Sequence, residues 1–138
     1  MPSADSENRS PALLKHISLE AAVIASEAMN VPFHDIISRQ RSKARVSFAR
    51  QIAMYLAHVV GEMSLGEISA VFERDRTTVG YACHIIEDRR DGPIFDREMA
   101  DLEIQFRTRL VALLAHEKLI EVSDQVDTQV RRRAHLRR

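Results

Sequence analysis

The spacing of the apolar residues constrains the fold of this chain more than any other feature. Along most of the sequence these residues recur every three or four positions, as on one face of an α-helix. No segment of usable length alternates apolar with polar residues, as a half-buried strand does. With 45% apolar residues among 138, the chain can bury a core. We therefore predict an all-α fold without a sheet.

The apolar stripes, with few glycines and prolines between them, divide the first two thirds of the chain into helices. Ser47 can cap the third helix, and Ser64 with Glu67 forms the Ser-x-x-Glu capping box that starts the fourth. The basic segment 39–45 has no periodic apolar pattern and is predicted to be a loop. The expected helices cover residues 13–29, 34–38 (short), 47–60, 64–73 and 77–90. We assign them to one domain, residues 11–92, which follows a disordered N-terminus over residues 1–10.

A run without glycine or proline from Phe95 to about Ser123 predicts a long C-terminal helix. At 1.5 Å per residue it would span about 40 Å, more than the preceding small domain needs. Two roles stay open. The helix folds back over the core or over helix 13–29, or it forms the seam of a homodimer through residues 95–122, which the nearly all-apolar LVALLA at 110–115 favours. We assign residues 93–127 to this helix and residues 128–138 to a basic tail, disordered from residue 131 onward.

The formal net charge of the chain is zero, but the charges are unevenly distributed. Residues 1–30 carry −2 and residues 31–90 carry +2, whereas residues 91–130 carry −5 and the tail 131–138 carries +5. A neutral average argues against a general polyanion binder only if the charges are evenly mixed. This chain instead combines a basic segment with an acidic arm.

Three features in one window of the sequence suit duplex DNA. The loop region is basic, with no acidic residue between Ile36 and Val60. Helices 64–73 and 77–90, joined by a tight link, match the helix-turn-helix pattern, in which the second helix enters the major groove. The third feature is the set of polar residues that open this second helix. The basic residues of the loop region are Arg39, Arg41, Lys43, Arg45 and Arg50, and the residues that open the second helix are Arg74, Asp75, Arg76, Thr77 and Thr78.

The chemistry of these side chains fits base reading. Arginine bonds bidentately to guanine, aspartate accepts from cytosine, and threonine offers its methyl group to thymine. A basic loop can place an arginine in the adjacent minor groove. Each feature also has a structural interpretation: short helix pairs are common in all-α proteins, Asp75 can simply cap its helix, and a basic loop is often only a solvated surface. Their coincidence, in this order, favours DNA binding.

Residues 17–90 resemble the C-terminal DNA-binding domain of the bacterial chromosomal replication initiator, the DnaA family. The resemblance lies in four segments and in their order and spacing, with about one extra residue in the basic loop. The segments are SRQRSKAR in that loop, ARQIAMYLA at 49–57, SLGEIS at 64–69 and RDRTTVGYAC at 74–83.

The resemblance implies a box-like duplex site that is read in both grooves. The implied base contacts in the major groove are Asp75, Arg76 and Thr77, with Arg74 and Thr78 beside them at bases or phosphates. The helix that Ser64 and Leu65 open would pack on the phosphate backbone, and Arg41, or alternatively Arg45, would enter the minor groove. Arg39, Lys43 and Tyr81 complete the candidate DNA-binding set.

Three positions depart from the family pattern. The family usually has histidine where this chain has Arg76, lysine at the position of His58, and histidine at the position of Tyr81. A permanently charged bidentate donor at Arg76 predicts a preference for guanine at the base opposite it.

No set of residues indicates catalysis, a metal site or a cofactor, so we do not expect an enzyme. The six histidines form no H-x-x-x-H or H-E-x-x-H pair, and no GxxxxGK[ST] phosphate loop occurs in these 138 residues. Cys83 is expected to be a buried apolar residue. The carboxylates of Asp96, Glu98, Asp101 and Glu103 are expected to form a solvated helix face. The most apolar stretch, residues 110–115, is too short for a membrane span, and without a visible secretion signal we expect a cytoplasmic, nucleoid-associated protein.

The leading hypothesis is a sequence-specific double-stranded DNA-binding protein that regulates transcription. One alternative is a replication modulator that competes with the initiator for its boxes, since both roles need the same DNA surface. The other is an interaction adaptor, in which the domain docks a protein partner and no longer reads bases.

Overall fold

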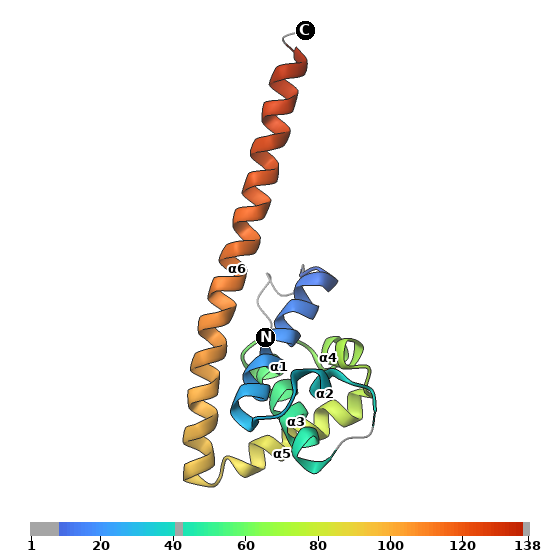
Figure 1. The fold of residues 1–138 in the computed structure, drawn as a ribbon, viewed down its shortest axis with the longest axis vertical. Helices are drawn as coiled ribbons and strands as arrows, with labels where there is room; N and C mark the ends of the chain where they lie inside the picture. Colours follow the sequence, from blue (N-terminus) through green and yellow to red (C-terminus); the bar gives the residue numbers. More distant parts are fainter. Residues whose placement is uncertain (1–8, 41–42, 137–138) are drawn as a thin grey trace.

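The computed structural model describes residues 9–40 and 43–136, and within these residues all regular structure is helical. Figure 1 shows five helices gathered into a small domain and a sixth that runs far beyond it. The all-α prediction is confirmed. The helices are α1 (Pro11–Met29), α2 (Phe33–Ile37), α3 (Ala44–Val59), α4 (Leu65–Phe72), α5 (Arg76–Arg89) and α6 (Pro93–Leu136).

Helix α3 is the centre of the domain and contacts α1, α2, α4 and α5. Its middle turns bury residues on every side of the helix, from Ile52 to Ala57. Alanines with no exposed surface lie on both α1 and α3, and their small side chains let the two backbones approach closely. Helix α3 also packs against α4 and α5 on their buried side.

The starts of α1 and α4 are fixed by local hydrogen bonds. The Leu13 N–H donates to the Ser10 hydroxyl at 3.1 Å, so α1 begins earlier than the apolar pattern predicts. The predicted capping box of α4 is confirmed. The Glu67 N–H donates to the Ser64 hydroxyl at 3.1 Å, and the Ser64 N–H donates to the Glu67 carboxylate at 2.8 Å.

Part of the predicted disordered N-terminus is ordered. The Arg9 guanidinium donates to the carbonyl oxygens of Gly61 at 2.6 Å and Glu62 at 2.7 Å, just beyond the end of α3. Disorder is therefore wrong for Arg9 and Ser10, because the Arg9 guanidinium binds two carbonyls of the loop that follows α3 and the Ser10 hydroxyl caps α1. Residues 1–8 of that segment lie outside the described part of the chain.

Helix α3 begins at Ala44, one turn before the predicted cap at Ser47. Lys43 occupies the N-cap position, and the Ser47 N–H donates to its carbonyl oxygen at 3.0 Å. The prediction of a loop through Arg45 is wrong because alanine and arginine are good helix formers. After the helix, a Cβ on Gly61 would lie 2.6 Å from the Ala57 carbonyl oxygen, so the chain can turn this closely only at a glycine.

Helix α6 does more than fold back on the domain. Its first half does so, with Met99 and Phe106 fully buried and with contacts to α1. Its second half leaves the domain as an exposed helix that continues to Leu136 (Figure 1). The predicted end near Ser123 and the disorder over residues 131–136 are wrong, because no glycine or proline interrupts the helix. Residues 137 and 138 lie outside the described part.

The direction of α6 is fixed by Arg90, at the C-cap of α5. Its guanidinium donates to the Asp96 carboxylate at 2.6 Å, to the Tyr55 hydroxyl at 3.1 Å and to the Glu103 carboxylate. The Tyr55 hydroxyl in turn donates to Glu87 at 2.8 Å, which joins α3, α5 and α6 in one network. Burial acts to lower the Arg90 pKa, but the hydrogen bonds to Asp96, Glu103 and Tyr55 outweigh it and raise the pKa.

This network corrects the prediction of a solvated carboxylate face on the first turns of α6. Glu98 and Asp101 are exposed as expected, whereas Glu103 is only 9% exposed and Asp96 pairs with Arg90. The prediction failed because the cation lies outside this helix, at the end of α5. Within residues 9–40 and 43–136, no helix is both long and apolar enough to cross a bilayer.

We expect Arg90→Ala to lower the free energy of unfolding by about 3–5 kcal/mol, because it leaves the buried Glu103 carboxylate with only the exposed, more distant Arg107 as a cation. Urea unfolding followed by circular dichroism measures this loss. The matched control is Arg107→Ala, since Arg107 reaches the same carboxylate at 3.5 Å from an exposed position and should cost less than about 1 kcal/mol. Equal losses in the two variants would contradict the proposed dependence on Arg90.

Candidate nucleic-acid interface

Helices α4 and α5 form a helix-turn-helix with a short, strongly bonded turn. Glu73 ends α4 in the left-handed conformation, with φ 54°, and the Arg74 N–H donates to the Ser69 carbonyl at 3.1 Å. The Ser69 hydroxyl donates to the Arg74 carbonyl oxygen from the opposite direction. These two hydrogen bonds stabilise the turn that leads into the exposed start of α5. The inner faces of both helices are buried through Ile68, Phe72, Val79, Ala82 and Ile86.

Four consecutive residues at the start of α5 are exposed, namely Asp75, Arg76, Thr77 and Thr78. Tyr81, one turn further along the helix, is 62% exposed. Asp75 occupies the N-cap position, but its carboxylate accepts no capping hydrogen bond from the described part of the chain. Asp75 therefore begins α5 at its N-cap position without a side-chain cap, and its exposed carboxylate lies near the free N–H groups of the first turn.

Arg76 lies over the first turn of α4, at Gly66. A Cβ built on Gly66 would lie 2.6 Å from Nη2 of Arg76 and 3.0 Å from its Cζ and Nε. The guanidinium can therefore occupy this position only because residue 66 has no side chain. Sequence reasoning passed over Gly66, since a glycine inside a short helix signals nothing about a partner ten residues later.

The basic loop is fastened to the turn between α4 and α5. Arg39 forms an ion pair with Glu73, and the Arg74 guanidinium donates to the carbonyl oxygens of Ser38 at 3.0 Å and Phe72 at 3.3 Å. Arg74 is half-buried, so part of its charge is used inside the protein. These contacts bring the loop and the start of α5 to the same edge of the domain. Arg41, the expected minor-groove residue, lies outside the described residues.

Two other arginines of this region have structural contacts. Arg45 donates from Nε to the Met29 carbonyl oxygen at 2.9 Å, at the end of α1. Arg50 is only 7% exposed and donates to the carbonyl oxygens of Ile36 at 2.7 Å and Asp35 at 2.8 Å. Burial, with the nearby charge of Arg74, lowers the Arg50 pKa.

The inclusion of Arg50 among the surface bases is therefore corrected. Its position could have been found from the sequence, since Arg50 shares a helical stripe with Val46, Ala53 and Ala57, all of which are buried. A basic residue on an apolar stripe indicates an internal contact rather than a surface charge.

Ser64 and Leu65 begin α4 beside α5, where Leu65 faces Gly80 and Gly66 lies under Arg76. The Ser64 hydroxyl is used by the capping box, and Leu65 packs partly against the core. In Figure 1, α4 and the start of α5 lie on the side of the domain away from α6. The structure thus gathers Arg39, Lys43, Ser64, Leu65, Arg74, Asp75, Arg76, Thr77, Thr78 and Tyr81 around the helix-turn-helix and the loop that binds it.

The remaining candidates for chemistry lie elsewhere. Cys83 is half-buried against the core, and burial raises its thiol pKa to about 11, which keeps it protonated and unreactive. The His58 ring donates from Nδ1 to the Met63 carbonyl oxygen at 2.8 Å. Among the residues that the structure describes, no three His, Cys, Asp or Glu side chains are grouped as metal ligands.

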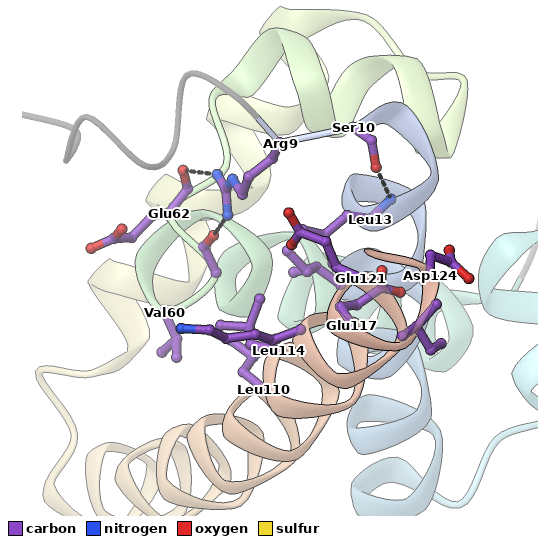
Figure 2. Close-up of a pocket in the computed structure, with 14 residues that line it drawn as sticks. Arg9, Ser10, Leu13, Val60, Glu62, Leu110, Leu114, Glu117, Glu121 and Asp124 are labelled. Carbon is purple, nitrogen blue, oxygen red and sulfur yellow. Dashed lines mark hydrogen bonds between the residues drawn. The ribbon is translucent and has the colours of Figure 1, made fainter. Parts of the chain in front are cut away.

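A groove on another side of the domain lies between α6 and the start of α1 (Figure 2). Its floor is apolar, with Leu13, Leu110 and Leu114, and carboxylates of α6 such as Glu117 and Glu121 line it. Acidic groups repel phosphate, so this groove does not suit nucleic acid. The helix-turn-helix edge remains the candidate interface.

We expect Arg74→Ala to speed trypsin cleavage of the loop at residues 39–43 by about tenfold or more, because the Ser38 carbonyl loses a charged donor. Cleavage followed by mass spectrometry under native conditions measures this change. Arg76→Ala is the matched control, since Arg76 is exposed nearby but lies over α4 rather than the loop. Cleavage of both variants at the wild-type rate would contradict the role of Arg74 in holding the loop.

Comparisons with known proteins agree with this geometry. Residues 22–86 match the family described as the bacterial dnaA protein helix-turn-helix. The chain is also similar to a solved structure titled "crystal structure of DNA replication initiation factor", with 33% sequence identity and a TM-score of 0.62. That match covers 70% of this chain and 30% of the other, so the chain spans less than a third of the length of that protein.

Proposed function

We propose that the chain is a sequence-specific double-stranded DNA-binding protein, from the premise that residues 22–86 match the helix-turn-helix of the bacterial dnaA protein. One observation carries the proposal: Asp75, Arg76, Thr77 and Thr78 are exposed together at the start of α5, and the Asp75 carboxylate is not used as a cap. In a recognition helix these positions face base edges. We assign DNA reading to residues 11–92, with α6 as a separate arm.

The start of α5 enters the major groove in the proposed complex. Arg76 donates to a guanine, Asp75 accepts from a cytosine amino group, and Thr77 contacts a base edge or a thymine methyl group. Thr78 and Tyr81 lie toward the flanking phosphates. The free N–H groups of the first turn of α5 add favourable partial charge for a phosphate.

The basic loop contributes mainly affinity. Arg39 and Lys43 contact phosphates without reading sequence, and Arg41 enters the minor groove. The contacts of Arg45 with Met29, which hold it against α1, favour Arg41 over Arg45 for this role. Arg74 positions the loop through Ser38, so its removal is expected to affect both grooves.

Within this DNA-binding function, we propose a transcriptional regulator that acts at promoters. The second candidate is a replication modulator that competes for initiator boxes, which the similarity to a replication initiation factor favours. Genome-wide occupancy separates the two roles, since promoter sites support the first and sites confined to the origin support the second.

We expect Arg76→Ala to weaken binding by about 1–3 kcal/mol at a single base pair, because one bidentate contact is lost. A selection from random duplexes first identifies the site, and fluorescence anisotropy then compares it with a scrambled duplex over a salt series. Wild-type protein should separate the two duplexes by about 4 kcal/mol or more. Lys43→Ala is the control and should weaken both duplexes alike, with a salt slope smaller by about 1.

Equal affinity for the selected and scrambled duplexes, with only a steep salt dependence, would reject sequence-specific binding. That result would leave the adaptor hypothesis, in which the same surface docks a protein.

Gly66→Ala should reduce discrimination at one base pair of the site without lowering the stability of the fold. The new Cβ would displace the flexible end of Arg76, while alanine in a helix stabilises by about 0.5–1 kcal/mol over glycine. We expect unchanged or higher stability in urea, but loss of discrimination at the base pair that depends on Arg76. Gly80→Ala is the matched control, since its Cβ would meet Leu65 at an ordinary 3.6 Å. Full discrimination in Gly66→Ala would contradict this role of Gly66.

A further inference from the structure

Helix α6 carries a second apolar stripe that does not touch the domain. Its large members are strongly exposed, including Val111 at 69% and Leu119 at 68%. Small residues occupy positions between the large ones, and together they follow the helical repeat along one face. The stripe, hereafter the outer stripe, consists of Ile104, Thr108, Val111, Ala112, Ala115, Leu119, Val122, Val126 and Val130.

The outer stripe lies on the face of α6 opposite the core. At about 100° per residue, Ile104, Val122 and Val126 project from one side of the helix, whereas Met99 and Phe106, which are fully buried, project from the other. The stripe extends over about 40 Å of helix. A helix that only had to remain in water would not need a continuous apolar face of this length.

Eight of the nine residues of the outer stripe are arranged symmetrically about residue 117, and only Val111 would face a residue outside the stripe, Ser123. Reversing the helix about this point places Ile104 opposite Val130, Thr108 opposite Val126, Ala112 opposite Val122, and Ala115 opposite Leu119. In two of these pairs, Ala112 with Val122 and Ala115 with Leu119, a small residue meets a larger one, which allows the side chains of two helices to interdigitate. The same sequence therefore complements itself when two copies run in opposite directions.

Charges at the two ends of the stripe favour the same orientation. Asp101 lies three residues before Ile104, and Arg133 lies three residues after Val130, both on the side of the helix that carries the stripe. An antiparallel pair places Asp101 of each copy beside Arg133 of the other. A parallel pair would instead place like charges together at both ends.

We infer that the outer stripe is the interface of an antiparallel homodimer, formed by the α6 helices of two copies of this chain. The seam contains valine, leucine, isoleucine, alanine and one threonine, with charge only at its ends, which suits a second helix better than a phosphate backbone. In this dimer, one face of the first half of α6 packs on its own domain, and the opposite face packs on the α6 helix of the partner.

This dimer leaves the proposed DNA surface uncovered. Each domain lies on the inner face of its own α6, and the helix-turn-helix lies on the side of the domain away from α6 (Figure 1). With the two α6 helices in the middle, the two recognition surfaces face outward, away from each other. One consequence, which rests on the proposed function, is that a dimer bridges two duplex segments rather than two adjacent half-sites on one segment.

Sedimentation equilibrium tests the dimer without DNA. The full chain should sediment at twice its 15.7 kDa mass, and Val122→Glu should raise the dimer Kd by about tenfold or more, since it buries a charge in the seam. Thr128→Glu adds the same charge to an exposed position of α6 off the outer stripe, and it should remain dimeric. Circular dichroism checks that both variants keep their helix content. A monomeric wild-type chain, or equal weakening by both variants, overturns the inference.

Cysteine cross-linking tests the orientation. In a Cys83→Ala background, one chain carries Ile104→Cys and another carries Val130→Cys. Under mild oxidation the antiparallel dimer should form a disulfide only when the two chains are mixed, because the two positions meet across the seam. Disulfides formed by each chain alone would indicate parallel pairing and overturn the antiparallel assignment.

Bridging is tested by capturing a second, labelled duplex on an immobilised one. Wild-type chain should retain the second duplex, whereas Val122→Glu should bind the first duplex and retain no second. A dimer that binds no DNA rejects the proposed function and leaves the dimer intact. A dimer that binds DNA but never retains a second duplex overturns the outward arrangement of the two surfaces.

Discussion

The guanidinium of Arg90 is the interaction on which the arrangement of this protein depends. It is the point where the last helix of the domain becomes the long arm, and it binds carboxylates from two turns of that arm as well as the Tyr55 hydroxyl on the central helix. Because Glu103 is buried, the contact tolerates little movement. These contacts join α5 and the arm at the end of α5 that is remote from the proposed DNA contacts.

At the other end of α5, one short turn serves two purposes. Ser69 and the left-handed Glu73 fix the angle between α4 and α5, while Glu73 and Arg74 also hold the basic loop through Arg39 and Ser38. A major-groove helix and a minor-groove loop must keep a fixed separation to bind one duplex. In this chain the link between them is a set of charge-assisted contacts to the turn itself, so the two elements cannot be altered independently.

Local signals in the sequence predicted most of the fold. The capping box of Ser64 and Glu67, the tight link between α4 and α5, and the apolar stripes depend on residues a few positions apart, and all appear in the structure. The wrong bounds of α3 and α6 have local causes, whereas the missed side-chain contacts involve partners that are distant in sequence. Glu103 meets Arg90 across a helix junction and Arg76 lies over Gly66, and no spacing rule contains these contacts. The burial of Arg50, in contrast, follows from its place on an apolar stripe. The candidate DNA residues could be grouped from sequence because the helix-turn-helix itself is local.

Because α6 is uninterrupted, the helical repeat constrains the insertions and deletions that this helix can accept. Because the inner and outer faces belong to one continuous helix, inserting or deleting a single residue after Phe106 would rotate everything beyond it by about 100° relative to the domain. Changes of about seven or eleven residues nearly restore the original phase, whereas changes of about one, two or five do not. Related chains should therefore differ in the length of this helix by whole numbers of turns, so that its register is preserved.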